Sequence, residues 1–219
     1  MDVIDDVVRI ESGHAVLDAD LRVPQRAAGL VIFAHGSGSG RFSPRNRAVA
    51  ASLEQSGFAT LLADLLTREE EAVDQYTRQH RFDIGLLGRR VVDAVDWAQG
   101  QPELRTLPVA TFGASTGAAA ALIAAGERPR LVRAVISRGG RPDLAEEALE
   151  QVKAPTLLIV GGDDDAVIEL NQEAARRMRA PVELKIIPGA THLFEERGAL
   201  EQVARLASAW CVRHLKEPS

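Results

Sequence analysis

The strongest constraint on this chain is the regular alternation of short apolar runs with segments of helical periodicity. Each run is five or six residues long and almost continuously apolar. Such runs are typical of strands that are covered on both faces, as in a parallel sheet. The sequence therefore predicts strands at residues 30–34, 59–63, 108–112, 132–136, 156–160 and 182–187.

Helical patterns fill the intervals between these runs. Ser43 followed by Pro44 is a helix start, and Gly57 is a stop. Further helices are predicted from an apolar stripe at 84–98 and at 116–125, 144–152, 167–178 and 200–215. Two early strands, 7–10 and 15–23, are joined by a turn at 12–13. The pattern predicts one α/β domain over residues 1–219 with a mostly parallel sheet.

Composition narrows the class of protein. Hydrophobic residues make up 46% and charged residues 26% of the chain, as in a globular domain, and the net charge of −5 argues against nucleic-acid binding. The single cysteine, Cys211, excludes an internal disulfide and offers no metal-binding spacing. The first six residues are acidic and lead into no signal-peptide core, and no apolar run approaches the ~20 residues of a membrane span. We therefore expect a soluble cytoplasmic protein, a monomer or homodimer, without membrane contact.

The acidic run at 69–74 is interpreted as a solvated helix face or loop, with a lid as the alternative.

The sharpest chemical signal is Gly113-Ala114-Ser115-Thr116-Gly117, which matches G-x-S-x-G. A predicted strand precedes it and a predicted helix follows, so the serine would stand on a tight strand-to-helix turn with Oγ exposed. The helix N-terminus there favours negative charge. An ordinary glycine-rich turn before a helix is the plainer alternative. The context nevertheless favours Ser115 as a nucleophile.

A serine nucleophile needs a base, and the base needs a carboxylate to orient it. Downstream of Ser115, one predicted strand ends at Gly161-Gly162-Asp163-Asp164-Asp165 and the last ends at Pro188-Gly189-Ala190-Thr191-His192. Strand ends are where open α/β sheets place their sites. We expect His192 to be the base and Asp164 its partner. Asp163 or Asp165 could take that role instead, and all three acids could simply cap the next helix.

The loop His35-Gly36-Ser37-Gly38-Ser39-Gly40 follows the strand at 30–34. Acyl transfer needs donors aimed at the developing oxyanion, and we expect the backbone N–H groups of Ser37 and Thr116 to supply them. His35 is interpreted as structural. A phosphate-binding loop is the rival interpretation, but the sequence lacks both the Lys-Ser/Thr ending of a P-loop and G-x-G-x-x-G.

Taken in order, HGSGSG, GASTG, GGDDDAV and GATHLF resemble an α/β-hydrolase, and the short chain most resembles the dienelactone-hydrolase-like branch. The resemblance runs from about residue 7 to 215. It implies a three-layer α/β/α fold without a large cap, an eight-stranded sheet whose second strand is antiparallel, and a Ser115–Asp164–His192 triad. Dienelactone hydrolase proper is similar in fold but uses a cysteine nucleophile where this chain has Ser115, which points to a more general serine esterase.

The expected function is hydrolysis of small or short-acyl carboxylic esters through an acyl-enzyme, with no metal or organic cofactor. The alternatives are a non-catalytic binding domain of the same fold, an acyltransferase or perhydrolase using the same triad, and a nucleotide-binding domain. Arg138, after the strand at 132–136, and Arg41 and Arg45, after the glycine-rich loop, could bind an anionic substrate group. The plainer expectation is that they are solvated or paired with nearby acids.

Overall fold

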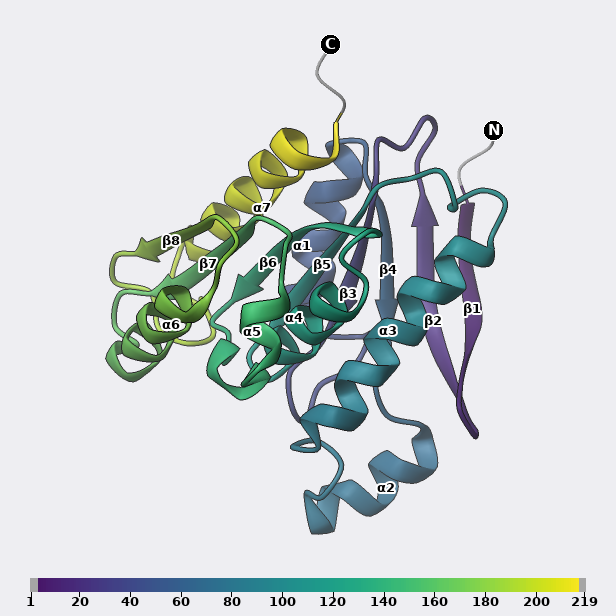
Figure 1. Ribbon diagram of the computed structural model, residues 1–219, viewed down its shortest axis with the longest axis horizontal. Helices are drawn as coiled ribbons and strands as arrows, with labels where there is room; N and C mark the ends of the chain where they lie inside the picture. The colour runs from purple at the N-terminus through teal and green to yellow at the C-terminus, as the bar shows by residue number, and fades with distance from the viewer. Residues whose placement is uncertain (1–3, 217–219) are drawn as a thin grey trace.

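The computed structural model describes residues 4–216, which form one eight-stranded sheet in the order β1-β2-β4-β3-β5-β6-β7-β8 (Figure 1). β2 is antiparallel to both of its neighbours, β1 and β4, and every other neighbouring pair is parallel, as the resemblance implied. The strands are β1 Ile4–Ser12, β2 Ala15–Val23, β3 Leu30–Ala34, β4 Ala59–Ala63, β5 Val109–Ala114, β6 Val132–Arg138, β7 Thr156–Gly161 and β8 Val182–Ile187.

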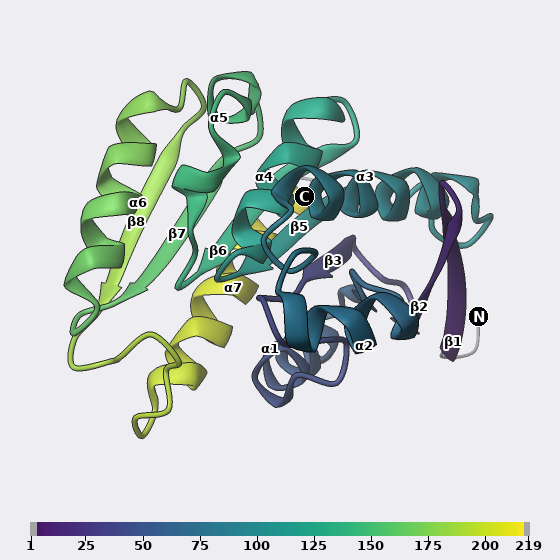
Figure 2. The same ribbon diagram turned by 90° about the horizontal axis from the view of Figure 1, so that it is seen from below.

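Helices cover both faces of the sheet, which gives the three-layer α/β/α arrangement predicted (Figure 2). α1 (Pro44–Gln55) and α7 (Ala199–Leu215) lie on one face, and α3 (Ile84–Gly100), α4 (Gly117–Glu127) and α6 (Asp165–Arg177) lie on the other. Each face has its own hydrophobic core against the sheet, which is aliphatic on the α3/α4/α6 side and also contains phenylalanine and tryptophan side chains on the α1/α7 side. Within residues 4–216 no segment forms a large cap, and no helix has the length and apolar character of a membrane span.

Local sequence signals place the helix starts. Ser43 Oγ accepts a hydrogen bond from the N–H of Asn46, and Pro44 occupies the first position of α1. Thr67 and Glu70 form a reciprocal capping box at the start of α2 (Arg68–Thr77). α4 consists largely of alanine, so its backbone can approach the sheet closely. The residues that set these boundaries are all close in sequence to the element they begin.

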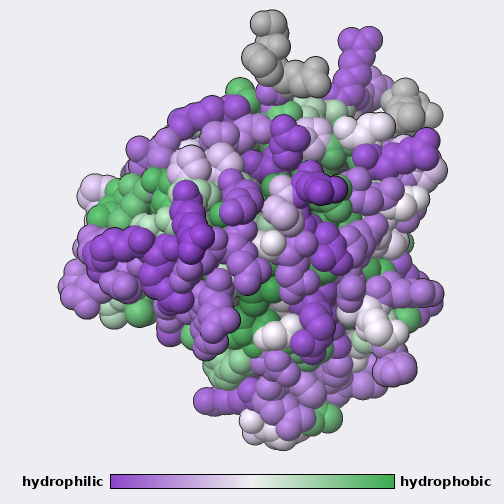
Figure 3. Space-filling view, viewed as in Figure 1, coloured by the Kyte–Doolittle hydropathy of each residue, from purple (hydrophilic) through white to green (hydrophobic). Residues whose placement is uncertain are grey.

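The strands differ from the prediction mainly at their ends. β5 and β6 each continue two residues further than their apolar runs, to Ala114 and Arg138, because they pair with each other along that length. β8 is an edge strand and is only partly covered, with Ile186 45% exposed. Figure 3 shows hydrophobic surface over this left-hand edge on an otherwise mostly hydrophilic face.

The single helix predicted at 144–152 is wrong. The chain forms a 3-10 turn at Pro142–Ala145 and one short helix, α5, at Ala148–Gln151. Between them Glu146 has φ +49°, a conformation that no right-handed helix can contain.

The acidic run at 69–74 lies in α2, which Figure 1 shows projecting from the lower end of the sheet. Most of it is solvated, as expected, but Asp74 is only 1% exposed and accepts hydrogen bonds from the N–H groups of His80 and Arg81. The run therefore has a structural member that holds the loop after α2.

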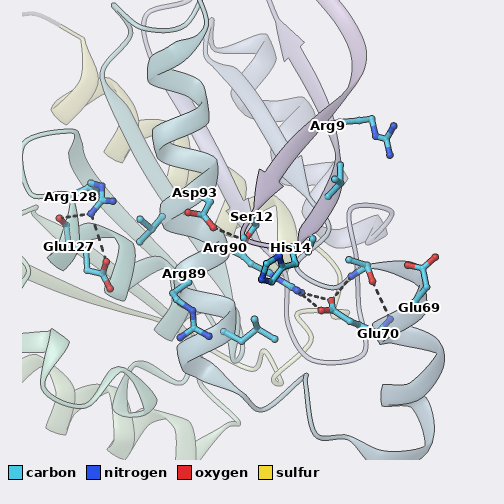
Figure 4. Close-up of a pocket in the computed structure, with 16 residues that line it drawn as sticks. Arg9, Ser12, His14, Glu69, Glu70, Arg89, Arg90, Asp93, Glu127 and Arg128 are labelled. Carbon is cyan, nitrogen blue, oxygen red and sulfur yellow. Dashed lines mark hydrogen bonds and ion pairs between the residues drawn. The ribbon is translucent and has the colours of Figure 1, made fainter.

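A cavity of about 860 Å³ lies between the β1–β2 turn, α2 and α3. Its lining includes the buried Arg90, which donates to both carboxylate oxygens of Glu70 (Figure 4). Arg90 also donates to the carbonyl of Leu65. Ser12 also donates to Asp93 here. The Arg90–Glu70 pair therefore fastens α2 to α3.

Candidate active site

Ser115 stands at the turn between β5 and α4 with φ +51°, a left-handed conformation that is uncommon for any residue other than glycine. The two motif glycines explain how the turn can be this tight. A Cβ on Gly113 would lie 2.3 Å from Cα of Ala118, and a Cβ on Gly117 would lie 2.2 Å from the carbonyl oxygen of Ala34. The motif therefore has the geometry of a nucleophile elbow.

Asp164 and His192 meet across two neighbouring strand ends. Asp164 follows β7, His192 follows β8, and Oδ2 of the carboxylate lies 2.7 Å from Nδ1 of the imidazole. Asp164 makes no side-chain cap to α6 although it occupies the cap position, so its carboxylate is free to serve the histidine. Asp163 and Asp165 are exposed. The structure thus brings Asp164, rather than either neighbour, against His192.

Backbone contacts join this pair to Ser115. The Ser115 N–H donates to the carbonyl of Arg138 at 3.2 Å, and the next residue, Gly139, lies against the His192 loop, because a Cβ on it would be 3.1 Å from the His192 carbonyl. Within the described residues no hydrogen bond links Ser115 Oγ to His192. In unliganded enzymes such bonds are often long and tighten only when substrate binds.

The glycine-rich loop lies directly against the elbow. A Cβ on Gly36 would be 3.1 Å from Cβ of Ser115, a tight contact that glycine avoids. The Ser37 N–H donates to Oγ1 of Thr116 at 2.9 Å, and in the described part of the chain the Thr116 N–H has no protein acceptor. The two expected oxyanion donors are therefore next to each other, one of them bonded to the other's side chain.

The sequence also matches a model of the Dienelactone hydrolase family over residues 17–213. The chain belongs to this family. A dienelactone hydrolase from Anabaena variabilis, known from its crystal structure, is 56% identical, and the match covers 98% of this chain and 99% of that one with a TM-score of 0.96. This agreement confirms the α/β-hydrolase fold that the four motifs indicated.

One further relative and one solved structure of the same fold are also similar to this chain. A putative phosphoribosyl transferase of Mycobacterium tuberculosis is 54% identical over 98% of this chain and 47% of its own, so the chain spans about half the length of that relative. Est1E from Butyrivibrio proteoclasticus is 18% identical, with a TM-score of 0.79 over 94% of this chain and 98% of that one, and shares the fold.

In this dienelactone hydrolase family member, His35 is a buried structural residue. Its Nε2 accepts a hydrogen bond from the N–H of Leu65 at 2.9 Å, which leaves Nδ1–H to donate to the carbonyl of Gly36 at 2.9 Å. Burial lowers the pKa of His35, and the bond to Gly36 offsets only part of that effect. A neutral, doubly bonded imidazole fixes the start of the glycine-rich loop.

The arginines named as candidate anion ligands are in different surroundings. Arg41 is 8% exposed and is held by the carboxylates of Asp64 and Asp20, so its charge is already neutralised. Arg138 is equally buried but has no acidic partner among residues 4–216, and its Nη2 donates to Oδ1 of Asn46 at 3.1 Å. Asn46 is a site neighbour that sequence reasoning missed, since an asparagine in the first turn of a helix carries no signal of its own.

The remaining titratable candidates lie outside this arrangement. Cys211 is buried in α7, and burial raises the pKa of its thiol to about 12. His14 is exposed in the β1–β2 turn, and His214 stacks on Trp210 in α7. Among the histidines within residues 4–216, His192 is the one with a carboxylate partner at the strand ends.

Proposed function

We propose that the chain is a serine hydrolase of carboxylic esters, with Ser115 as nucleophile, His192 as general base and Asp164 as the residue that orients it. The observation that carries this proposal is the Asp164–His192 hydrogen bond at the edge of the sheet where Ser115 stands in a left-handed turn. Nucleophile, orienting acid and base follow one another along the chain, as Ser115, Asp164 and His192, in the order found on this fold.

In the proposed reaction Ser115 Oγ attacks the ester carbonyl carbon while His192 Nε2 takes the hydroxyl proton. The C–O bond to the alcohol then breaks, His192 returns the proton to the departing alkoxide, and an acyl-serine remains. Water, deprotonated by His192, attacks the acyl carbon. The bond from that carbon to Ser115 Oγ breaks, His192 returns the proton to Oγ, and the acid is released. Asp164 stabilises the charged imidazole in both halves and does not take up the proton.

The oxyanion is proposed to bind between the N–H groups of Thr116 and Ser37. The Thr116 N–H begins α4, where the helix dipole adds to its effect. The Ser37 N–H must give up or share its bond to the Thr116 hydroxyl when the oxyanion forms. The loop that carries Ser37 packs on the elbow through Gly36, which favours a role in acyl transfer over an independent phosphate site.

For the substrate class, a small or short-acyl ester is favoured over a long lipid, because residues 4–216 form no large cap over the strand ends. The transferase name of the M. tuberculosis relative belongs to a protein about twice as long, and we assign ester hydrolysis to the half that this chain matches. An acyl acceptor other than water, as in an acyltransferase or perhydrolase, would use the same triad.

The test is hydrolysis of p-nitrophenyl acetate and butyrate by wild type and Ser115→Ala, with labelling by a fluorophosphonate read by mass spectrometry. We expect turnover and a single adduct on Ser115 in the wild type and neither in the variant. Ser52→Ala, in α1, is the matched control and should retain both. Hydrolysis that survives in a folded Ser115→Ala protein would overturn the assignment. A folded wild-type protein with neither turnover nor adduct would instead favour a non-catalytic binding domain of the same fold.

A further inference from the structure

A second cavity lies at the edge of the sheet opposite the candidate active site. It has a volume of about 790 Å³ and is formed where β3, β5 and β6 begin, beside the last residues of α7. Figure 1 shows the end of α7 and the connection from α3 to β5 close together at the upper edge of the molecule. A strand of six residues spans about 20 Å, so a ligand in this cavity would not reach Ser115 at the other end of β5.

Basic side chains surround this cavity, which we call the basic hollow, and none of its lining residues is acidic. The basic lining residues are Arg105, Arg130, Arg133, Arg213, His214 and Lys216. Within residues 4–216, Arg213 pairs with Glu183, whereas the other three arginines and Lys216 have no acidic partner. A concavity lined by one sign of charge attracts ions of the opposite sign, and here it does so on a chain whose net charge is −5.

The backbone is irregular at the point where it carries Arg133. β5 and β6 pair at Val109–Val132 and next at Ala110–Ala134, so Arg133 is an extra residue without a partner in β5. Such a bulge is rare between parallel strands, and bulges commonly redirect a side chain at a functional site. Here the bulge residue is exposed and lines the basic hollow together with Arg130.

The basic hollow has an apolar floor. Its arginines and Lys216 are exposed, whereas Leu107, Pro108 and Leu131 between them are partly buried. The volume is within the range of sites for small molecules. A concave site of this size, on an acidic chain, favours a compact anion with an organic part over an extended nucleic acid.

We propose that the basic hollow binds a small molecule that carries a chain of two or three phosphate groups. The guanidinium groups of Arg105, Arg130 and Arg133 donate to the phosphate oxygens, two N–H groups at a time, and Lys216 adds a point charge. A nucleotide and a free polyphosphate share this chemistry, and the nucleoside of a nucleotide would lie on the apolar floor. The site is separate from the proposed esterase site and does not depend on it.

The experiment measures binding of ATP, tripolyphosphate and adenosine by calorimetry at low ionic strength without added Mg²⁺. We expect one saturable site for both polyphosphates and none for adenosine. Arg130→Gln/Arg133→Gln, at two exposed positions, should weaken that binding about tenfold or more, as expected when hydrogen bonds to charged groups are lost. Arg176→Gln, at a 67% exposed position in α6, is the matched control and should stay within twofold. Arg105→Gln provides the same test if the double variant does not fold.

The arms of the experiment also identify the source of the phosphates. Tighter binding of ATP than of tripolyphosphate would identify a nucleotide, and tripolyphosphate binding at least as tightly would identify a free polyphosphate. Absence of binding by both compounds, or the same affinity in wild type and in the folded double variant, would overturn the proposal. Tight binding of a single-stranded oligonucleotide without saturable binding of ATP would also overturn it, because the surface would then bind nucleic acid.

His214 provides a second measurement inside the basic hollow. Burial and then the charge of Arg213 lower the pKa of His214, whereas Glu183 acts in the opposite direction. A bound phosphate chain adds negative charge, so saturation with tripolyphosphate should raise the pKa of His214 in an NMR titration, while His14 in the β1–β2 turn should not respond. An unchanged pKa of His214 at saturation would place the anion elsewhere and overturn the proposal. Hydrolysis of p-nitrophenyl acetate should be the same in the double variant and the wild type, so the two assignments can fail separately.

Discussion

The imidazole of His192 is held by Asp164 through a single 2.7 Å contact between Nδ1 and Oδ2, made across the ends of β7 and β8. The contact fixes which ring nitrogen carries the proton in the neutral imidazole, because Nδ1 must donate to the carboxylate. Nε2 is then unprotonated and can accept the serine proton.

This contact predicts a large effect for Asp164→Asn. The amide can stabilise the wrong tautomer and cannot stabilise the imidazolium, so kcat for p-nitrophenyl acetate should fall about 10³- to 10⁴-fold while the protein stays folded. Asp163→Asn and Asp165→Asn, at exposed neighbouring positions, are the matched controls and should stay within about twofold. A comparable loss of kcat in Asp163→Asn or Asp165→Asn, with Asp164→Asn still active, would mean that this neighbour orients His192 and that Asp164 does not.

Gly117→Ala should unfold or strongly destabilise the protein. The new methyl would lie 2.2 Å from the Ala34 carbonyl oxygen and 2.5 Å from that of His35, and both obstacles are backbone atoms. We expect a loss of more than about 2 kcal/mol in the free energy of unfolding, measured by urea denaturation. Gly100→Ala, which meets no atom within 4 Å, should change it by less than about 0.5 kcal/mol. Equal stability of the two variants would contradict the packing described for the elbow.

The Arg90–Glu70 pair should make the free energy of unfolding depend on pH in the acidic range. Hydrogen bonding from Arg90 lowers the pKa of Glu70, although partial burial opposes the shift. The carboxylate therefore contributes stability above its unfolded pKa of about 4.3, and that contribution is lost as pH falls through the lower folded pKa.

Glu70→Gln should accordingly lower the free energy of unfolding by about 1–2 kcal/mol at pH 7, with the gap to wild type narrowing below pH ~4. Chemical denaturation across pH measures this gap. Glu173→Gln, which breaks the exposed pair with Arg176, is the control and should cost less than about 0.5 kcal/mol. A gap that stays constant down to pH 3 would contradict the ionic role of Glu70.

Burial of the neutral His35 imidazole predicts a second pH dependence of the free energy of unfolding, which again falls as the pH falls. Because its pKa is lowered in the folded protein, the unfolded chain takes up a proton first, at pH ~6.5, and stability falls as pH drops below that value towards the folded pKa. His35→Leu removes this proton uptake. It also leaves the Leu65 N–H unpaired, which should cost about 1–3 kcal/mol at pH 8.

The difference in unfolding free energy between wild type and His35→Leu should therefore shrink between pH 7 and 5. His14→Leu, at an exposed turn position, should show no such narrowing and should cost less than about 0.5 kcal/mol. A pH-independent difference for His35→Leu would mean that this histidine titrates freely in the folded protein.

Much of the fold could be predicted because its signals are local. The apolar runs of β3, β4 and β8 match their strands residue for residue, and Ser43-Pro44 marks the start of α1. The prediction of a single helix at 144–152 was wrong because an apolar pattern does not indicate that Glu146 takes a positive φ. Strand ends were underestimated where pairing, which depends on residues distant in sequence, extends them.

In the candidate site, too, some features follow from local sequence and others depend on contacts between residues distant in the chain. Ser115, Asp164 and His192 each follow a parallel strand, so their placement at one edge of the sheet could be expected from the sequence. The surroundings of the arginines could not, because they depend on long-range packing. Arg138 contacts Asn46, 92 positions earlier in the chain, and Arg41 is enclosed by aspartates from β2 and the end of β4.

The close packing of Gly113 and Gly117 also has a practical consequence for protein engineering. Because backbone atoms from β3 and α4 leave no space for even one methyl at these positions, the elbow is a fixed element that a mutant library should leave untouched. Glu195, in the loop after β8, and Arg45, in the first turn of α1, are instead partly exposed side chains. Variation aimed at a new ester belongs in that loop and in the first turn of α1.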